Sequence, residues 1–257
     1  MRMGLREVVP EVRAVLFDTD GVLLDSAVLH AAAWKRAFDA CLTTGAFGTG
    51  QPAFDETDEY TALVDGKSRF DGARDFLRAR GVALPAGTPD DPPGCATVWA
   101  VAAAKERAMV ATLRDTAVRV YSDVAPALRA LRDASLPLAA VSASRHARPL
   151  LAAAGLDLLL DTVLDGTDAA RLGLPGKPDP ALFLAAAHRL GTPPDRAAVV
   201  EDAVAGVQAG RRGGFALVVG VDRRAAPGTA DALRRHGAGL VVPDLTALAA
   251  RLGGGAA

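Results

Sequence analysis

Pairs of polar side chains follow three short apolar segments of this sequence, at the points where buried strands would end. In an open parallel sheet, ligands bind at the edge formed by the carboxyl ends of the strands. We therefore predict one polar site that gathers side chains from separate parts of the chain. Its members are Asp18 and Asp20 after residues 12–17, Ser142 and Ser144 after residues 136–141, and Glu201 and Asp202 after residues 197–200.

The segment Asp18-Thr-Asp20-Gly-Val places two carboxylates two residues apart, directly before a glycine. If the chain turns at Gly21, both carboxylates can face one site, where one attacks phosphorus and the other shuttles a proton. Taken alone, the same segment also fits a strand followed by an Asx turn. Phosphoryl transfer is the reading that uses both carboxylates.

Glu201 and Asp202 form a second carboxylate pair, and carboxylate oxygens are hard ligands that suit Mg²⁺. A cation is needed on physical grounds because Asp18 and a phosphate dianion repel each other, and Mg²⁺ would screen that repulsion. We therefore predict a Mg²⁺ cofactor. The alternative for Asp202 alone is that it caps the following helix.

Hydroxyl and ammonium groups complete the predicted phosphate site. Ser142 and Ser144, with the backbone N–H groups of a helix start, can bind phosphate oxygens. Lys177 lies in Pro-Gly-Lys-Pro-Asp-Pro, where the prolines stiffen the loop and aim the ammonium at a phosphate and at Asp18. A helix-capping serine and a solvated lysine are the ordinary alternatives for these residues.

The elements that must position these groups change character along the chain. From residue 118 onward, helices alternate with short apolar strands, which is typical of a parallel sheet with helices on both faces. Helices dominate from 27 to 117, including one with a capping box of Ser68 and Asp71. We predict strands at 12–17, 136–141, 162–164, 197–200, 215–219 and 239–242, and helices at 28–40, 69–80, 97–114, 122–134, 146–154 and 180–190. The expected fold is α/β, with a core of residues 1–26 and 118–257 and a helical cap domain of residues 27–117 inserted after the first strand.

Composition narrows the function classes. The 29 Lys and Arg residues balance 30 Asp and Glu residues, so nothing indicates a nucleic-acid surface or a polybasic membrane patch. The first residues lack the apolar run of a signal peptide, and the alanine-rich stretch 95–104 is too short to span a bilayer. Cys41 and Cys95 lack metal-ligand spacing, so we predict two free thiols in a reducing cytosol. We expect a cytoplasmic monomer whose partner is a small molecule.

The order of the motifs resembles the haloacid dehalogenase (HAD) superfamily. The resemblance covers nearly the whole chain and is carried by Asp18-x-Asp20-Gly-Val, Ser142, Gly-Lys177-Pro and Glu201-Asp202-Ala-x-Ala-Gly. It implies a Rossmann-like three-layer core, Asp18 as nucleophile and Asp20 as general acid/base. It also implies Mg²⁺ held by Asp18, the backbone carbonyl of Asp20 and Asp202, with Glu201 close by. The acid at position 20 argues against the dehalogenase branch.

A closer resemblance is to the β-phosphoglucomutase family, through residues 24–34, Asp65-Gly-Lys-Ser-Arg69, Ser142-Ala-Ser144-Arg145 and Glu201-Asp202-Ala-x-Ala-Gly. It implies that His30, Arg69 and Lys105 in the cap handle the sugar and a distal phosphate, helped by Arg145. The position of Arg69 supports this, because a cation in the first turn of a helix opposes the macrodipole and an anionic ligand would remove the conflict. A solvated arginine is the alternative.

Several positions depart from the pattern of that family. His146 and Glu106 stand where asparagine is common, and the loops at 43–54 and 85–94 lengthen the cap. These departures leave the exact substrate open, but none of them changes a phosphoryl-transfer residue.

The resemblance implies a Mg²⁺-dependent enzyme that moves a phosphoryl group of a sugar phosphate through an aspartyl phosphate at Asp18. In a mutase, the phosphorylated Asp18 donates to a sugar hydroxyl and later accepts the other phosphate of the bisphosphate. In a phosphatase, water attacks the same aspartyl phosphate. A non-catalytic sensor of sugar phosphates is a third hypothesis, which loss of Asp18, Asp20 or Asp202 would favour; all three are present.

Overall fold

The computed structural model describes residues 11–223 and 225–253. Its centre is a six-stranded parallel sheet with the strand order β5-β4-β1-β6-β7-β8. The strands are β1 (Ala14–Asp18), β4 (Leu138–Val141), β5 (Thr162–Leu164), β6 (Ala197–Glu201), β7 (Leu217–Val221) and β8 (Leu240–Val242). Each overlaps one of the six predicted strands, so the predicted parallel sheet is confirmed.

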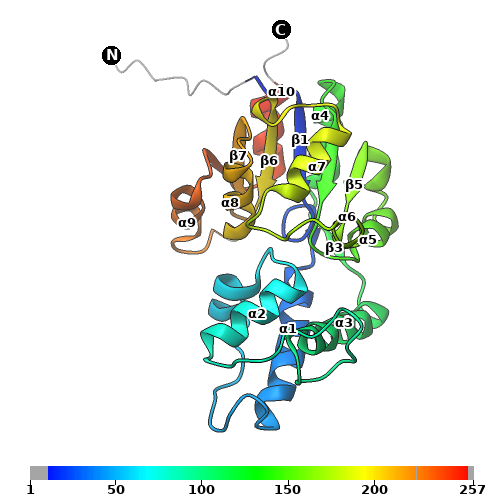
Figure 1. Cartoon of the computed structure of the whole chain (residues 1–257). Coiled ribbons are helices and arrows are strands. Elements are labelled where there is room, and N and C mark those ends of the chain that lie inside the picture. The colour runs from blue at the N-terminus through cyan, green and yellow to red at the C-terminus, as the bar shows by residue number, and fades with distance from the viewer. Residues whose placement is uncertain (1–10, 224, 254–257) are drawn as a thin grey trace.

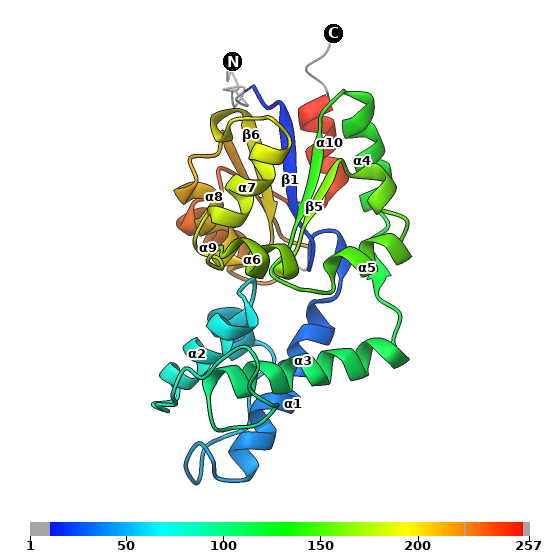
Figure 2. The ribbon, with the colours of Figure 1, turned by 45° about the vertical axis from the view of Figure 1, so that its right-hand side comes forward.

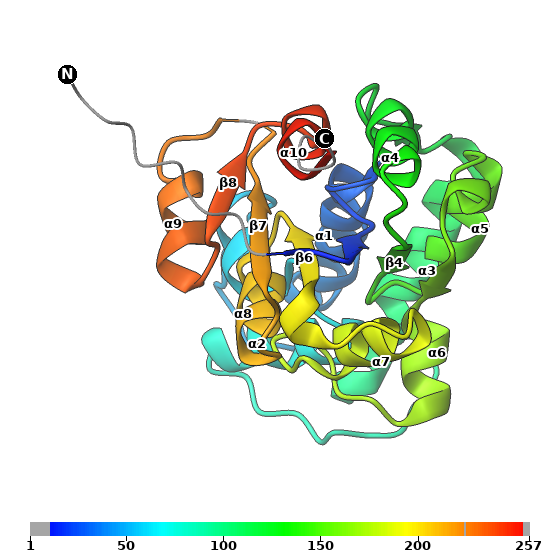
Figure 3. The same cartoon turned by 90° about the horizontal axis from the view of Figure 1, so that it is seen from above.

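Helices cover both faces of the sheet because the strands are apolar on both sides. Val15 and Phe17 of β1 pack with α4 (Val124–Asp133) and α10 (Leu245–Gly253) on one face. Ala14 and Leu16 point to the opposite face, where α7 (Ala181–Arg189) and α8 (Val204–Arg212) lie. Seen from above, the helices flank the strands on two sides, which confirms the three-layer α/β core (Figure 3).

The second part of the structure is helical and lies beyond the carboxyl edge of the sheet (Figure 1, Figure 2). It consists of α1 (Ala27–Thr43), the π-helical turn η1 (Tyr60–Val64), α2 (Arg69–Ala79) and α3 (Val98–Asp115). Although the chain has few aromatic residues, five of them are buried here: Trp34, Phe38, Phe47, Phe54 and Phe76. The rings of Phe38 and Phe76 stack with centroids 3.7 Å apart, so this part has an apolar core of its own.

Two short segments connect the helical part to the sheet. Strand β2 (Leu24–Asp25) leads out, β3 (Arg119–Val120) leads back, and the two pair antiparallel as a ribbon. The proposed boundaries of the cap, at 27 and 117, lie next to this ribbon. We keep residues 27–117 as the proposed extent of the cap domain.

The predicted helices are all present, with ends shifted by a few residues. Further elements lie outside the prediction, among them the ribbon β2–β3 and the helices α6 (Gly166–Leu172), α9 (Thr229–His236) and α10. Helix α5 (Ala147–Ala153) follows β4, as expected. The capping box of α2 is half formed: Ser68 Oγ accepts from the amide of Asp71, but the Asp71 carboxylate accepts from the Ser68 hydroxyl rather than from its backbone N–H.

The prediction of two free thiols is wrong in this structure. Cys41 and Cys95 form a disulfide between the end of α1 and the segment before α3, across 54 residues of sequence. Their spacing in the sequence fits no framework, because the contact arises only when α1 and α3 pack against each other. Within the described residues, no helix is both long enough and apolar enough to cross a membrane.

Candidate active site

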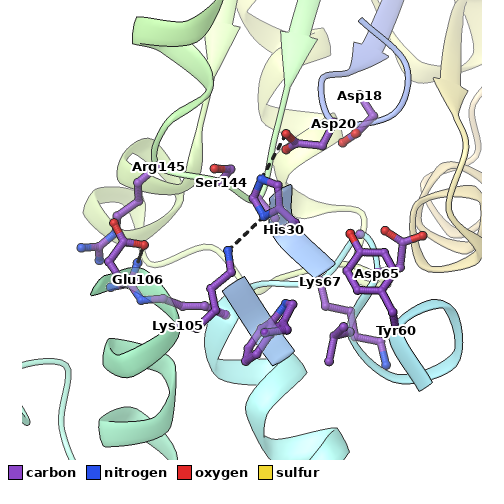
Figure 4. Close-up of a pocket in the computed structure, with 15 residues that line it drawn as sticks. Asp18, Asp20, His30, Tyr60, Asp65, Lys67, Lys105, Glu106, Ser144 and Arg145 are labelled. Carbon is purple, nitrogen blue, oxygen red and sulfur yellow. Dashed lines mark hydrogen bonds and ion pairs between the residues drawn. The ribbon is translucent and has the colours of Figure 1, made fainter. Parts of the chain in front are cut away.

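A pocket lies between the carboxyl edge of the sheet and the helical part (Figure 4). Seven of the residues predicted for the site line this pocket: Asp18, Asp20, Ser144 and Arg145 from the sheet side, and His30, Arg69 and Lys105 from the helical side. The other four, Ser142, Lys177, Glu201 and Asp202, contact Asp18 or Asp20 or lie within the same carboxylate group. The structure therefore brings together every residue that the sequence analysis selected.

Lys177 links two strand ends. Its ammonium contacts Asp18 Oδ1 at the end of β1 and lies 2.5 Å from Glu201 Oε1 at the end of β6. Burial alone would lower the pKa of this lysine, but the two carboxylates outweigh burial and raise it. Lys177 is thus a fixed positive charge beneath the pocket, available to neutralise Asp18 and a phosphate bound to it.

Three carboxylates meet at this edge of the sheet. One oxygen each of Asp18, Glu201 and Asp202 lies within 4.8 Å of the others. Burial and the neighbouring carboxylates raise the pKa of Asp18 and of Asp202 well above the ordinary value. Such crowding of acids is costly without a cation, and the hard-oxygen donor set fits a divalent ion such as Mg²⁺.

Two glycines make this crowding sterically possible. Gly21 has a φ of +83°, and a Cβ there would lie 1.8 Å from Asp202 Oδ2. A Cβ at Gly206 would lie 1.6 Å from Glu201 Oε1. These two positions explain the glycines in Asp18-x-Asp20-Gly and in Glu201-Asp202-Ala-x-Ala-Gly. A side chain at either position would push a carboxylate out of the group.

Glu201 is largely satisfied by the protein itself. Its Oε2 accepts from the amides of Asp202 and Ala203, at 3.0 Å each, while its Oε1 faces Lys177. Among the described residues, no comparable contact holds the carboxylate of Asp202. The carboxylate oxygens of Asp18 and Asp202 are therefore the best placed to bind a cation. Glu201 instead positions Lys177 and the loop that carries Asp202.

The Asp20 carboxylate occupies a different environment from the Asp18 group. It accepts from Ser26 Oγ at 2.5 Å and Ser142 Oγ at 3.0 Å, and His30 Nε2 lies 3.3 Å away. Burial opposes ionisation, but His30 and the two hydroxyls outweigh it and lower the pKa of Asp20. The pKa of Asp18 is raised while that of Asp20 is lowered, so the two acids lie in different electrostatic environments.

The end of the pocket away from Asp18 is rich in cations. Arg69, Lys105 and Arg145 line it, and burial followed by the charge of Arg145 lowers the pKa of Arg69. Ser144 belongs to a turn in which its amide donates to Ser142 Oγ at 3.0 Å. Because the guanidinium groups of Arg69 and Arg145 both line this end, it suits an anionic group of a ligand.

A family model described as haloacid dehalogenase-like hydrolase matches residues 12–214. The chain belongs to this family. This HAD membership confirms the predicted resemblance and the prediction that the chain is an enzyme.

Individual proteins that are similar to this chain support its membership of the HAD family. A β-phosphoglucomutase of Mycobacterium bovis is 45% identical over 96% of this chain and 94% of its own length. The structure of a HAD family hydrolase from Deinococcus radiodurans R1, with bound phosphate and sodium, is 30% identical, with a TM-score of 0.62 over 94% of this chain and 95% of that one. A β-phosphoglucomutase structure from Clostridium difficile, 23% identical, has a TM-score of 0.71 over 92% and 93% and shows the shared fold.

Some residues of this HAD site were not selected from the sequence. Tyr60, Asp65 and Lys67 line the pocket, and burial, followed by the charge of Glu201, raises the pKa of Asp65 to about 6. Asp65 and Lys67 belong to the segment Asp65-Gly-Lys-Ser-Arg69, so the motif that led to Arg69 also contained these two pocket residues. Ser26 lies four residues after the first motif, and its hydroxyl donates to Asp20.

Arg223 is a further residue that the sequence did not indicate. Its guanidinium donates to the carbonyls of Gly21 (3.2 Å) and Val22 (2.6 Å) and pairs with Asp123 at 2.8 Å. It also lies 3.9 Å from the ring centroid of Tyr121. Arg223 thus clamps the loop after Asp20 to the segment by which the chain returns to the sheet.

Proposed function

We propose that this chain is a β-phosphoglucomutase that converts β-glucose 1-phosphate into glucose 6-phosphate. The observation that carries the proposal is a single pocket with the Asp18 group at one end and the cations Arg69, Lys105 and Arg145 at the other. A mutase must hold a sugar with a phosphate at each end, whereas a phosphatase needs to hold only one. The 45% identity to a β-phosphoglucomutase over nearly the full length of both chains supports this assignment.

We propose Mg²⁺ as the cofactor. Asp18 and Asp202, with Glu201 close by and the backbone carbonyl of Asp20, would hold the ion, which screens the repulsion between Asp18 and the phosphate. Lys177 adds a second positive charge to the same end of the pocket. Both cations reduce the electrostatic cost of bringing a phosphate dianion to a carboxylate.

The proposed mechanism has two phosphoryl transfers. In the first, a sugar hydroxyl attacks the phosphorus of phosphorylated Asp18, Asp20 takes the hydroxyl proton, and the bond from phosphorus to Asp18 breaks. The bisphosphate then turns around in the pocket. In the second, Asp18 attacks the other phosphorus, and Asp20 returns its proton to the sugar oxygen that leaves. Ser142 keeps Asp20 oriented through its 3.0 Å hydrogen bond.

The helical part would grip the substrate and exclude water. His30 and Lys105 reach towards Asp20 from α1 and α3, and Arg69 with Arg145 would bind the phosphate that is not reacting. Water exclusion matters because water would otherwise hydrolyse the aspartyl phosphate. The partner of the protein is thus a small sugar phosphate.

A sugar-phosphate phosphatase is the second candidate. It is favoured by the description of the matching family as hydrolases and uses the same residues as far as the aspartyl phosphate. The two functions differ in whether water or a second sugar hydroxyl receives the phosphoryl group.

One assay separates the candidates. Purified protein is incubated with Mg²⁺, β-glucose 1-phosphate and a trace of glucose 1,6-bisphosphate, while glucose 6-phosphate and free phosphate are measured together. Glucose 6-phosphate without phosphate release, abolished by Asp18→Asn, supports the mutase. Phosphate release alone identifies a phosphatase. If neither product forms, β-glucose 1-phosphate is not the substrate, and other sugar phosphates are tested in the same way.

A further inference from the structure

Glu106 is a carboxylate at the cationic end of the pocket. It projects from α3, and Figure 4 shows it across the pocket from Asp18. Its Oε1 lies 2.9 Å from His146 Nε2 on the sheet side, and its Oε2 lies 3.8 Å from Arg69 Nη1 on α2. This carboxylate of α3 therefore contacts a guanidinium and an imidazole from two other segments.

The electrostatics show that Glu106 is the counter-charge of this end of the pocket. The contact with His146 lowers the pKa of Glu106 most; burial opposes the shift, and the charges of His146, Arg69 and Lys105 reinforce it, to about 2. The Nε of Arg69 has no hydrogen-bond partner among the described residues. The guanidinium of Arg69 thus retains donor capacity beside a carboxylate that only partly engages it.

The two residues of this contact are also the two that depart from the motif pattern. Glu106 follows Lys105, and His146 follows Arg145, at positions where asparagine is common in the resembling family. The structure shows that both departures meet in one contact of 2.9 Å. This contact lies at the end of the pocket where an anionic group of the ligand would bind.

We propose that Glu106 is an internal counter-anion that occupies the subsite of the substrate's distal phosphate until that phosphate displaces it. The proposal rests on the proposed function, because it needs a substrate with a phosphate at the end of the pocket away from Asp18. A phosphate dianion carries more charge than a carboxylate and can contact Arg69, Arg145 and His146 together, so the exchange is favourable. Glu106 nevertheless lowers the affinity of the subsite for anions, and most for those with less charge than a phosphate dianion, and it thereby contributes to specificity.

The test measures the binding of inorganic phosphate by calorimetry in EDTA, where the carboxylates near Asp18 repel phosphate. Glu106→Gln keeps the size of the side chain and removes its charge. Because a unit charge a few ångströms away is removed, the dissociation constant for phosphate is expected to fall about tenfold. Asp115→Asn is the matched control, since it removes one charge from an exposed position on the same helix and is expected to leave phosphate binding unchanged.

Arg69→Gln, introduced alone and together with Glu106→Gln, shows whether the gain in phosphate affinity arises at this subsite. If the gained affinity belongs to this subsite, it disappears in the double variant, so the two substitutions are not additive. Glu106→Asn serves as a second variant and is expected to gain affinity in the same direction.

Equal or weaker phosphate binding by both Glu106 variants overturns the proposal, because the carboxylate would then support phosphate binding through His146 rather than compete with it. This result is independent of turnover. A protein that turns over no sugar phosphate, but gains phosphate affinity on Glu106→Gln, refutes the proposed function and keeps the counter-anion. Turnover with unchanged phosphate affinity refutes the counter-anion alone.

Discussion

Lys105 Nζ lies 2.9 Å from His30 Nδ1, although the two residues are 75 positions apart in the sequence. An ammonium group can only donate, so Nδ1 accepts and the proton of a neutral imidazole is on Nε2. That nitrogen lies 3.3 Å from Asp20 Oδ1. Lys105 on α3 therefore sets the tautomer of His30 on α1, and His30 in turn faces the proposed general acid/base.

The alkaline limit of activity is expected to depend on Lys105. Burial lowers its pKa to about 8; Glu106 and Asp20 oppose this shift and Arg69 adds to it. As pH rises through this value the ammonium loses its proton, and His30 loses the charged donor that fixes its tautomer. We expect kcat/KM to fall above about pH 8.

Lys105→Arg checks this assignment, because arginine stays protonated across the whole range. Its alkaline limb is expected to move upward by at least about one pH unit, as measured from profiles between pH 6 and 10. An unchanged limb in this variant would assign the ionisation to another group.

Mg²⁺ is expected to stabilise the folded protein as well as activate it. The carboxylates of Asp18, Glu201 and Asp202 crowd one another, and a bound cation relieves this repulsion. At a concentration a hundred times its dissociation constant, the ion adds about 2.7 kcal/mol to the free energy of unfolding. Thermal unfolding with EDTA and with excess Mg²⁺ measures the difference in Tm.

Asp202→Asn is expected to remove both the activity and the gain in Tm from Mg²⁺, since it replaces a charged ligand of the ion. It is also expected to raise the Tm in EDTA, because one of the repelling charges is gone. Persistence of the full Mg²⁺ effect in this variant would place the cation elsewhere.

Arg223→Ala is expected to lower both stability and activity. The substitution leaves Asp123 without its partner and the carbonyls of Gly21 and Val22 without their donor. Loss of one member of such a poorly exposed pair costs about 3 kcal/mol of unfolding free energy. Displacement of the loop after Asp20 is expected to lower kcat by about tenfold.

Arg223→Lys is expected to restore part of the stability, and less of the activity, because lysine cannot donate to both carbonyls in the same geometry. Arg132→Ala is the control, since its ion pair with Asp161 is solvent-exposed and worth less than about 1 kcal/mol. If Arg223→Ala unfolds and reacts like the unmodified protein, the clamp has no role.

The disulfide between Cys41 and Cys95 is expected to stabilise the helical part. It closes a loop across 54 residues of sequence, for which the loss of chain entropy in the unfolded state amounts to about 4 kcal/mol. Denaturant unfolding with and without a reducing agent measures this contribution. A variant with Cys41→Ala and Cys95→Ala is expected to be insensitive to the reducing agent. Two reactive thiols in protein purified without a reductant would restore the prediction of free cysteines.

Local patterns were enough to predict the sheet and its polar edge. Strands β1, β4 and β6 are apolar runs that end at or just before a polar residue, so the sequence alone places Asp18, Ser142 and Glu201 at one edge. The cap residues His30, Arg69 and Lys105 were found through a resemblance, since their helical patterns alone indicate packing.

Contacts between distant segments could not be predicted in the same way. Arg223 donates to the backbone carbonyls of Gly21 and Val22. No side-chain pattern at these two positions predicts that an arginine after β7 will bind them. The ribbon β2–β3 is two residues long on each side and carries no periodicity. The Glu106–His146 contact likewise depends on how α3 lies against the sheet, which neither residue reveals alone.

The ribbon β2–β3 has an evolutionary consequence. The chain departs at Asp25 and returns at Arg119, and these two residues are paired neighbours. The stretch between them is thus a closed detour, which a hairpin turn of about two residues could replace without changing the order of the parallel strands. Such a shortened protein would keep the carboxylates at the edge of the sheet but lose His30, Arg69 and Lys105, so it would admit phosphate esters on bulky molecules without gripping a distal phosphate. Gain or loss of this one detour is therefore a simple genetic route between narrow and broad substrate ranges.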